Sequence, residues 1–275
     1  MKKFQFALMC AAALAFVACE KKDDGGVTPP TPTPDPDEPE FVSKISVTDK
    51  SAADWDNLPA DYVFTATSAA APAENRGALK SVKVFNDEMY LNLLVEWDAE
   101  KITDKAWVPF HIYIDADNSD ATGGYADEFA VGSVDICLET AILSADDAGT
   151  VASNYNPAVF KWWGEVGAQG WIWSDPNGTH DASDKWGAVV GEGDLPIGVS
   201  QVVADNMVEI QILRELIPAV TVNDKPIAAI GNEFKIGFDI QQNWTSVGVL
   251  PNADADETGA EVKANLMTVK TYLGE

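Results

Sequence analysis

Alternation of apolar and polar residues with a period of two runs through much of the chain. Period two is the signature of a half-buried strand, because successive side chains of a strand point to opposite faces. The clearest segments are residues 89–97, 110–115, 208–212 and 236–240, and a weaker one covers residues 262–273. Each of these segments is predicted to be a β-strand.

The segments between these strands carry turn signals. Asn86-Asp87 separates the apolar residues 82–85 from residues 89–97 and predicts a hairpin turn. Helical periodicity is nearly absent, and residues 214–219 predict only one turn, which Pro218 limits. Many strands joined by Gly, Asp and Asn turns predict an all-β fold, a two-sheet antiparallel β-sandwich. Without an internal repeat or a second linker, residues 43–275 are expected to form a single domain.

The N-terminus has the three zones that export requires. Two lysines precede an apolar run at residues 4–16, and Ala18-Cys19 follows. This order predicts a signal peptide at residues 1–18, too short to span a membrane. Its end resembles the bacterial lipobox, and that resemblance implies that Cys19 is acylated. The alternative is an ordinary cleavage site with Cys19 as a bystander.

Residues 19–42 are expected to be the lipidated cysteine and a linker. Residues 20–26 are polar, and their acidic residues resemble the tag that directs some Gram-negative lipoproteins to the outer face of the outer membrane. A plain solvated spacer is the alternative. Residues 27–40 are so rich in proline that neither helix nor sheet can form, which predicts a semi-rigid polyproline spacer.

The strongly acidic composition excludes some partners. The formal charge is -26, and loss of residues 1–18 with their two lysines makes it -28. Such a chain is not expected to bind nucleic acid or anionic lipid headgroups, whereas its carboxylates are ligands for hard cations. Of the three cysteines, Cys10 leaves with the signal peptide and Cys19 takes the lipid. Cys137 is left alone in a predicted strand, which favours a buried, inert thiol and no disulfide framework.

A series of short motifs along the chain resembles one known group of domains. The motifs are Asp54-Trp55-Asp56-Asn57-Leu58-Pro59, the hairpin of residues 79–97, residues 110–118, Thr122-Gly123-Gly124-Tyr125, residues 208–212 with Ile217-Pro218, and residues 236–243. Their order is similar to family 9 carbohydrate-binding modules and the related DOMON-like β-sandwich domains, over most of residues 45–275. The resemblance implies a two-sheet sandwich, often with structural calcium, that binds ligands and does not catalyse. Residues 141–191 depart from the pattern, so no sugar contacts are carried over there.

A compact acidic loop follows the predicted strand at residues 110–115. Asp115, Asp117 and Asp120 stand at positions one, three and six of this loop, where their carboxylates can converge on one cation, and Gly123-Gly124 lets the chain turn back. The loop is not an EF-hand, because it lacks the glycine at position six and the glutamate at position twelve. We expect a structural calcium ion at these three aspartates. The alternative is a polar loop whose aspartates cap their own backbone.

Five tryptophans fall close together in the departing segment. Indole rings stack on the flat C–H faces of sugars while nearby polar groups bind the hydroxyls. The sequence therefore predicts that at least one of these residues lies on a carbohydrate-binding surface, whereas any single one is expected to pack in the core. They are Trp162, Trp163, Trp171, Trp173 and Trp186.

Sequence motifs of common enzymes are missing. There is no Gly-x-Ser-x-Gly, phosphate loop or His-Glu-x-x-His, and mid-strand His111 between apolar neighbours favours a packed histidine. A glycosidase with paired carboxylates stays open, because folding decides which carboxylates meet. We expect a non-catalytic glycan-binding lipoprotein, anchored by lipid in the outer membrane of a Gram-negative bacterium and facing the exterior. The alternative is a scaffold or assembly subunit of a surface complex that binds protein and no sugar.

Overall fold

The computed structural model describes residues 43–144, 150–151, 154–168, 173–174, 186–190, 197–219, 221–222, 225–226 and 229–274. The chain divides into two units, Met1–Phe41 and Val42–Glu275, and every described residue belongs to the second unit. Among the described residues no helix has the length and apolarity needed to cross a membrane. The predicted signal peptide, Cys19 and the linker lie outside the described residues.

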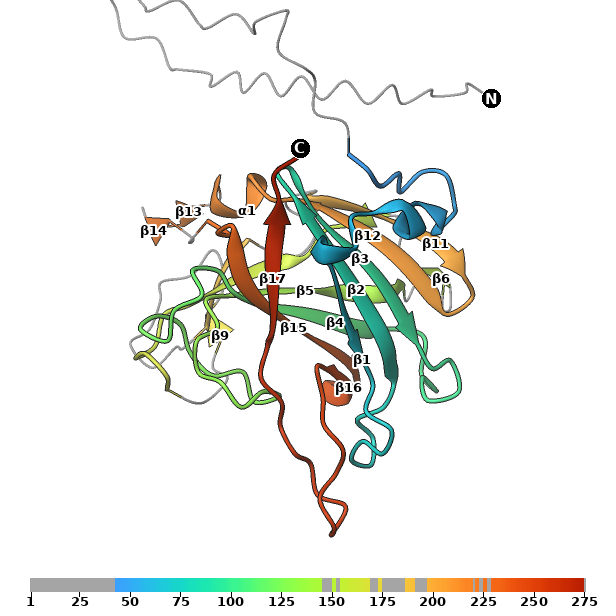
Figure 1. Ribbon diagram of the computed structural model, residues 1–275. Coiled ribbons are helices and arrows are strands. Elements are labelled where there is room, and N and C mark those ends of the chain that lie inside the picture. Colours follow the sequence, from blue (N-terminus) through green and yellow to red (C-terminus); the bar gives the residue numbers. More distant parts are fainter. Residues whose placement is uncertain are drawn as a thin grey trace, which may run out of the picture. The chain divides into compact units, whose positions relative to one another are not determined.

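Strands dominate the regular structure of the second unit (Figure 1), which confirms the predicted all-β fold. The described helices are three single turns: η1 (Ala53–Asn57), η2 (Ala60–Tyr62) and α1 (Leu216–Ala219). The strands in chain order are β1 (Val63–Thr67), β2 (Leu79–Asp87), β3 (Tyr90–Trp97), β4 (Val108–Asp115), β5 (Ile136–Ser144), β6 (Thr150–Val151), β7 (Asn154–Tyr155), β8 (Ala158–Trp162), β9 (Trp173–Ser174), β10 (Trp186–Val190), β11 (Gly198–Ala204), β12 (Met207–Leu213), β13 (Thr221–Val222), β14 (Lys225–Pro226), β15 (Glu233–Gln242), β16 (Thr245–Leu250) and β17 (Met267–Tyr272).

Hydrogen bonding joins most strands into one curled, mixed sheet. Its order is β7-β11-β12-β3-β2-β17-β15-β4-β5-β8-β10-β9, with β1, β6 and β16 paired at its sides. The two halves meet at β17, which is antiparallel to β15 and parallel to β2 (Figure 1). The all-β class is therefore confirmed, whereas a sandwich of two separate sheets is not, because β17 connects the halves.

The main core lies between the two halves of the curled sheet. Alternate residues of β2, β3 and β12 supply one side of it, and alternate residues of β4, β5 and β15 supply the other. Phe110 of β4 and Phe238 of β15 stack with ring centroids 6.0 Å apart. The segments with period two thus bury one face in this core, as their sequence pattern predicts.

The predicted hairpin of β2 and β3 forms, but its turn lies two residues further along the chain. Strand β2 continues to Asp87, and Asn86 pairs with Leu91. The carboxylate of Asp87 accepts hydrogen bonds from the backbone N–H groups of Met89 and Tyr90, at 2.9 and 2.6 Å. Asp87 therefore shapes the turn with its side chain while its backbone stays in the strand.

A smaller core covers the outer face of β15, β4 and β5. Tyr113 and Cys137 face outward from β4 and β5, and Phe129 packs edge-on against the Tyr113 ring at 5.7 Å between centroids. Gly237 of β15 lies opposite Tyr113, and a Cβ atom there would approach Phe129 Cζ to 2.5 Å. Strand β4 is consequently buried on both faces. Cys137 is a buried thiol, as predicted, and burial raises its pKa.

Candidate functional site

A histidine lies between two carboxylates on this outer face. The register places His111 of β4 opposite Glu139 of β5 and opposite Asp239 of β15. His111 Nε2 contacts Glu139 Oε2, and His111 Nδ1 lies 3.6 Å from Asp239 Oδ2. His111 is buried, as the sequence predicts, but its packing partners are charged and come from strands far away in the chain.

The imidazole of His111 is held in its charged form. Burial alone lowers its pKa, but the interactions with the carboxylates of Asp239 and Glu139 outweigh burial and raise the pKa to about 9. Gln241 Nε2 donates to Asp239 Oδ2 at 2.6 Å, and the Ser246 hydroxyl contacts the other oxygen of Asp239. A fixed imidazolium with two anionic neighbours therefore forms the base of the site at neutral pH.

A cleft with a volume of about 320 Å³ opens over this row. Pockets that hold small ligands span roughly 300–1,000 Å³, so the cleft matches a ligand of one or a few rings. Burial raises the pKa of Glu128 to about 7, and the nearby charge of Asp239 acts in the same direction. The lining residues are His111, Tyr113, Asp127, Glu128, Glu139, Gln241 and Trp244.

Trp244 stands at the edge of the cleft on the turn between β15 and β16. Gln242 pairs with Thr245, which leaves Asn243 and Trp244 as a two-residue loop. Their φ values of 48° and 60° correspond to a type I′ turn, where glycine is favoured at the second position. A side chain in this left-handed region costs roughly 1–2 kcal/mol. Trp244 is nevertheless 63% exposed, the highest fraction among the large hydrophobic residues that the structure describes as exposed.

Of the five tryptophans predicted to bind sugar, three have described side chains, and each of the three packs wholly or partly in a core. Trp162 and Trp186 are buried and pack edge to face, with ring centroids 5.2 Å apart, so neither presents a face to a ligand. Trp163 is partly buried against the main core, with Lys161 Nζ 5.7 Å from its ring centroid. Trp171 lies outside the described residues, and only the backbone of Trp173, in β9, is described.

Trp162 is buried because the chain makes room for its ring. A Cβ atom on Gly124 would lie 2.0 Å from the Trp162 indole, so only glycine permits this contact. The indole Nε1 donates to the carbonyl of Glu165 at 3.1 Å. Trp244 lies outside the motifs that predicted a binding site, although a tryptophan where turn chemistry favours glycine was a usable signal.

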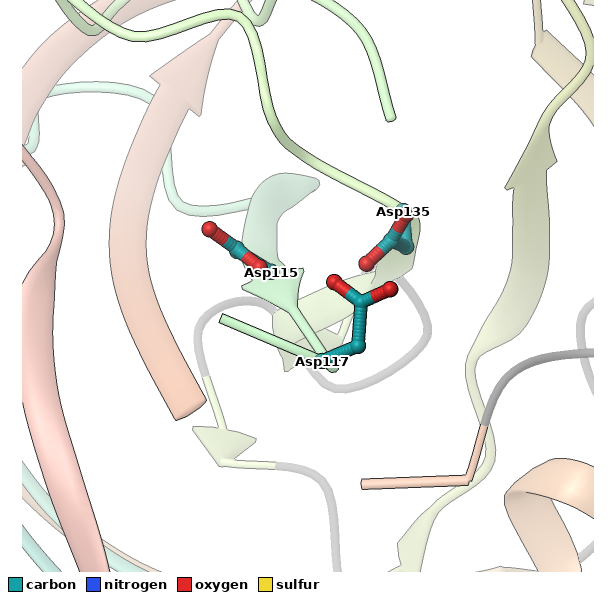
Figure 2. Close-up of side chains that lie close together, drawn as sticks. All are labelled: Asp115, Asp117 and Asp135. Carbon is teal, nitrogen blue, oxygen red and sulfur yellow. The ribbon is translucent and has the colours of Figure 1, made fainter. Parts of the chain in front are cut away.

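The acidic loop after β4 does bring carboxylates together. Asp115, Asp117 and Asp135 each have a carboxylate oxygen within 4.8 Å of the others, and Figure 2 shows them clustered. Asp115 is fully buried and accepts hydrogen bonds from the Ser133 hydroxyl at 2.8 Å and from Lys235 Nζ at 3.1 Å. The predicted members Asp115 and Asp117 are therefore neighbours in space.

Asp120, the third predicted ligand, lies outside this cluster. Its side chain is 92% exposed, and one of its oxygens lies 3.6 Å from Lys235 Nζ. Asp135 takes the third position, because its backbone N–H bonds to the Ile114 carbonyl and its Oδ2 accepts the backbone N–H of Ala116 at 2.9 Å. This contact crosses between chain segments, so spacing within the loop could not reveal it.

The cluster has the chemistry of a site for a hard cation. Burial raises the pKa of Asp135 to about 6, although the Ala116 N–H opposes the rise and the charges of Asp117 and Asp115 add to it. Oxygens bound to one calcium ion at roughly 2.3–2.6 Å lie no more than about 5 Å apart, which fits the observed spacing. Three carboxylates supply part of a six- to eight-oxygen shell. Lys235 already neutralises part of the charge.

Comparison with protein-family models, with curated proteins and with solved structures found no match to this chain.

Proposed function

We propose that this protein is a non-catalytic glycan-binding lipoprotein and that its sugar site is the cleft beside Trp244. One observation carries the proposal: an exposed indole stands next to a cleft lined by carboxylates, an amide and a charged histidine. Sugars are bound in this way, by an aromatic ring against their C–H face and by polar groups on their hydroxyls.

The strain at Trp244 supports a binding role. A residue with φ of 60° persists where glycine is easier only if its side chain is needed or if the surroundings force it. At 63% exposure the indole has few packing neighbours that could force it. Contact with a ligand is the function that such a ring can serve.

The lipid anchor and the finer fold belong to the same proposal. The N-terminal sequence that ends at Cys19 supports attachment to the outer membrane of a Gram-negative bacterium, and the proline-rich residues 27–40 support a spacer. The resemblance to family 9 carbohydrate-binding modules and DOMON-like sandwiches is supported by the order of the strand motifs and by a core between two halves of the sheet.

We also propose that Asp115, Asp117 and Asp135 bind a structural calcium ion. Their crowded oxygens and the raised pKa of Asp135 support it, because a divalent cation relieves the repulsion between the three groups. The site lies at one end of the outer face of β4, and His111 lies four residues away, about 13 Å along the strand. The ion would fix the loop after β4, and no residue of the cleft would contact it.

Replacing Trp244 by glycine tests the proposed sugar site. The change removes the indole, but it supplies the residue that the turn favours, so the free energy of unfolding should be unchanged or rise by about 0.5–1 kcal/mol. Wild-type protein should be retarded in affinity electrophoresis on at least one of a panel of polysaccharides. Trp244→Gly should lose that retardation, even where the dissociation constant is only in the range of about micromolar to millimolar.

Two matched variants separate the possible locations of the site. Trp107→Ala removes another exposed tryptophan, one that does not line the cleft, and should leave retardation intact. Trp171→Ala tests the segment that the sequence favoured. If retardation disappears with Trp171→Ala and persists with Trp244→Gly, the sugar site lies in residues 141–191. If no glycan retards the wild type and a stable protein complex is recovered from the outer membrane, the scaffold function replaces glycan binding.

A further inference from the structure

More acidic than basic side chains surround the cleft. Asp127, Glu128 and Glu139 line it, and Asp239 lies directly behind it. Against these four carboxyl groups stands the single imidazolium of His111, which already contacts two of them.

Two described side-chain cations near the cleft, Arg76 and Lys263, have partners of their own. Arg76 Nη2 forms an ion pair with Glu261 at 2.9 Å, and its Nη1 contacts the Ser246 hydroxyl. Lys263 Nζ contacts the backbone carbonyl of Asp127 and lies 5.9 Å from the ring centroid of Tyr125. Neither group lines the cleft. A ligand in the cleft therefore meets more negative charge than positive charge.

This imbalance acts differently on different sugars. A uronate or sulfate would add another anion beside Glu128 and Glu139, and repulsion is strong where water is partly excluded. An ammonium group would be attracted by the same carboxylates and by the face of Trp244, since an indole attracts cations. Burial is the main cause of the raised pKa of Glu128, and the charge of Asp239 adds to it.

We infer that the cleft ranks glycans by charge, preferring sugar units with a free amino group over neutral units and excluding acidic units. This inference rests on the proposed function, because it describes the ligand of the same site.

A series of oligosaccharides of equal length tests the ranking. β-1,4-linked glucose, N-acetylglucosamine, glucosamine and glucuronic acid share one backbone and differ in the group at C2 or C6. Titration calorimetry at slightly acidic pH, where the amine is charged, should show the glucosamine oligomer binding about fivefold or more tighter than the two neutral oligomers. The glucuronic acid oligomer should show no binding, and added salt should shrink the differences.

Two substitutions tie the ranking to the cleft. Asp127→Asn removes the carboxylate of an exposed lining residue and should reduce the preference for the amino sugar. Glu100→Gln, an exposed glutamate that does not line the cleft, should leave it unchanged. Equal or tighter binding of the acidic oligomer, or a preference that survives Asp127→Asn, overturns the ranking and leaves glycan binding itself intact. Failure of every oligosaccharide and every polysaccharide to bind overturns the proposed function and the ranking with it.

Discussion

At the scale of single residues, His111 has the most informative environment. An imidazole buried beside two carboxylates gains a proton more readily than one in water, because both anions favour the cation. Its folded pKa of about 9 lies above the ordinary value of 6.5. The protonated histidine therefore stabilises the folded state below about pH 6.5, and this contribution is lost as the pH rises through about 9.

We predict that stability falls by about 2 kcal/mol between about pH 7 and pH 9 through His111. The raised pKa values of Glu128 and Asp135 also lower stability as the pH rises, but mostly below about pH 7 and about pH 6, so they add little to the fall above pH 7. Nuclear magnetic resonance can follow the His111 ring directly in a His180→Gln variant, since the chain has only two histidines. A titration midpoint near 6.5 would contradict the buried ion pair.

At the scale of elements, the strand ends and turns position the candidate sites. The β15–β16 turn carries Trp244, and the loop after β4 carries Asp115 and Asp117. The acidic loop at residues 254–257 behaves differently, because Asp256 Oδ1 accepts the backbone N–H groups of Thr258 and Ala260. Asp256 therefore caps the backbone of its own turn, as acidic residues in loops often do without binding a metal ion.

For the loop after β4, calcium should raise the thermal stability of the wild type, because only the folded chain assembles the three carboxylates. An excess of about 100 times the dissociation constant corresponds to about 2.7 kcal/mol. Asp135→Asn should abolish this gain, while Asp120→Asn, with its exposed side chain, should retain it. The gain should also weaken below about pH 6, where protons compete for Asp135. If Asp120→Asn loses the calcium effect and Asp135→Asn keeps it, the ligands are those that the sequence predicted, Asp115, Asp117 and Asp120.

At the scale of the whole molecule, net charge and the N-terminal sequence decide how the protein is expected to be held at a membrane. A formal charge of -26 keeps the chain soluble and repels anionic surfaces, so attraction to headgroups is not expected to hold it on a membrane. We propose that a covalent lipid attaches the protein to the membrane, and Cys19 is the predicted site. Both candidate sites lie on the outer face of the described sheet.

Cys19→Ser should therefore release the protein from membranes and abolish labelling by a fatty-acid analogue. Cys10→Ser is the matched control, since this cysteine leaves with the predicted signal peptide, and it should not change labelling. Membrane fractionation and labelling of whole cells measure both variants. Unchanged labelling of Cys19→Ser would show that this cysteine does not carry the lipid.

The local pattern of the sequence determined the all-β class and the main strands. Strands β3, β4, β12 and β15 were predictable because burial of one face of each in the main core imposes period two on the residues. The proximity of Asp115 and Asp117 was also predictable, because two residues that are two positions apart in the chain must lie close in space. Cys137 was predicted as buried from its apolar neighbours for the same local reason.

Only the tertiary structure decided which distant residues meet. Glu139 and Asp239 reach His111 through the register of three neighbouring strands, and a shift of one residue would turn these side chains to the opposite face. Asp135 replaced Asp120 through a contact across segments. The same holds for tryptophan: Trp162 is buried because Gly124 admits its ring, and Trp244 is exposed because a tight turn projects from the sheet. Burial of an indole depends on which residues pack over it, and the composition of the chain does not determine those residues.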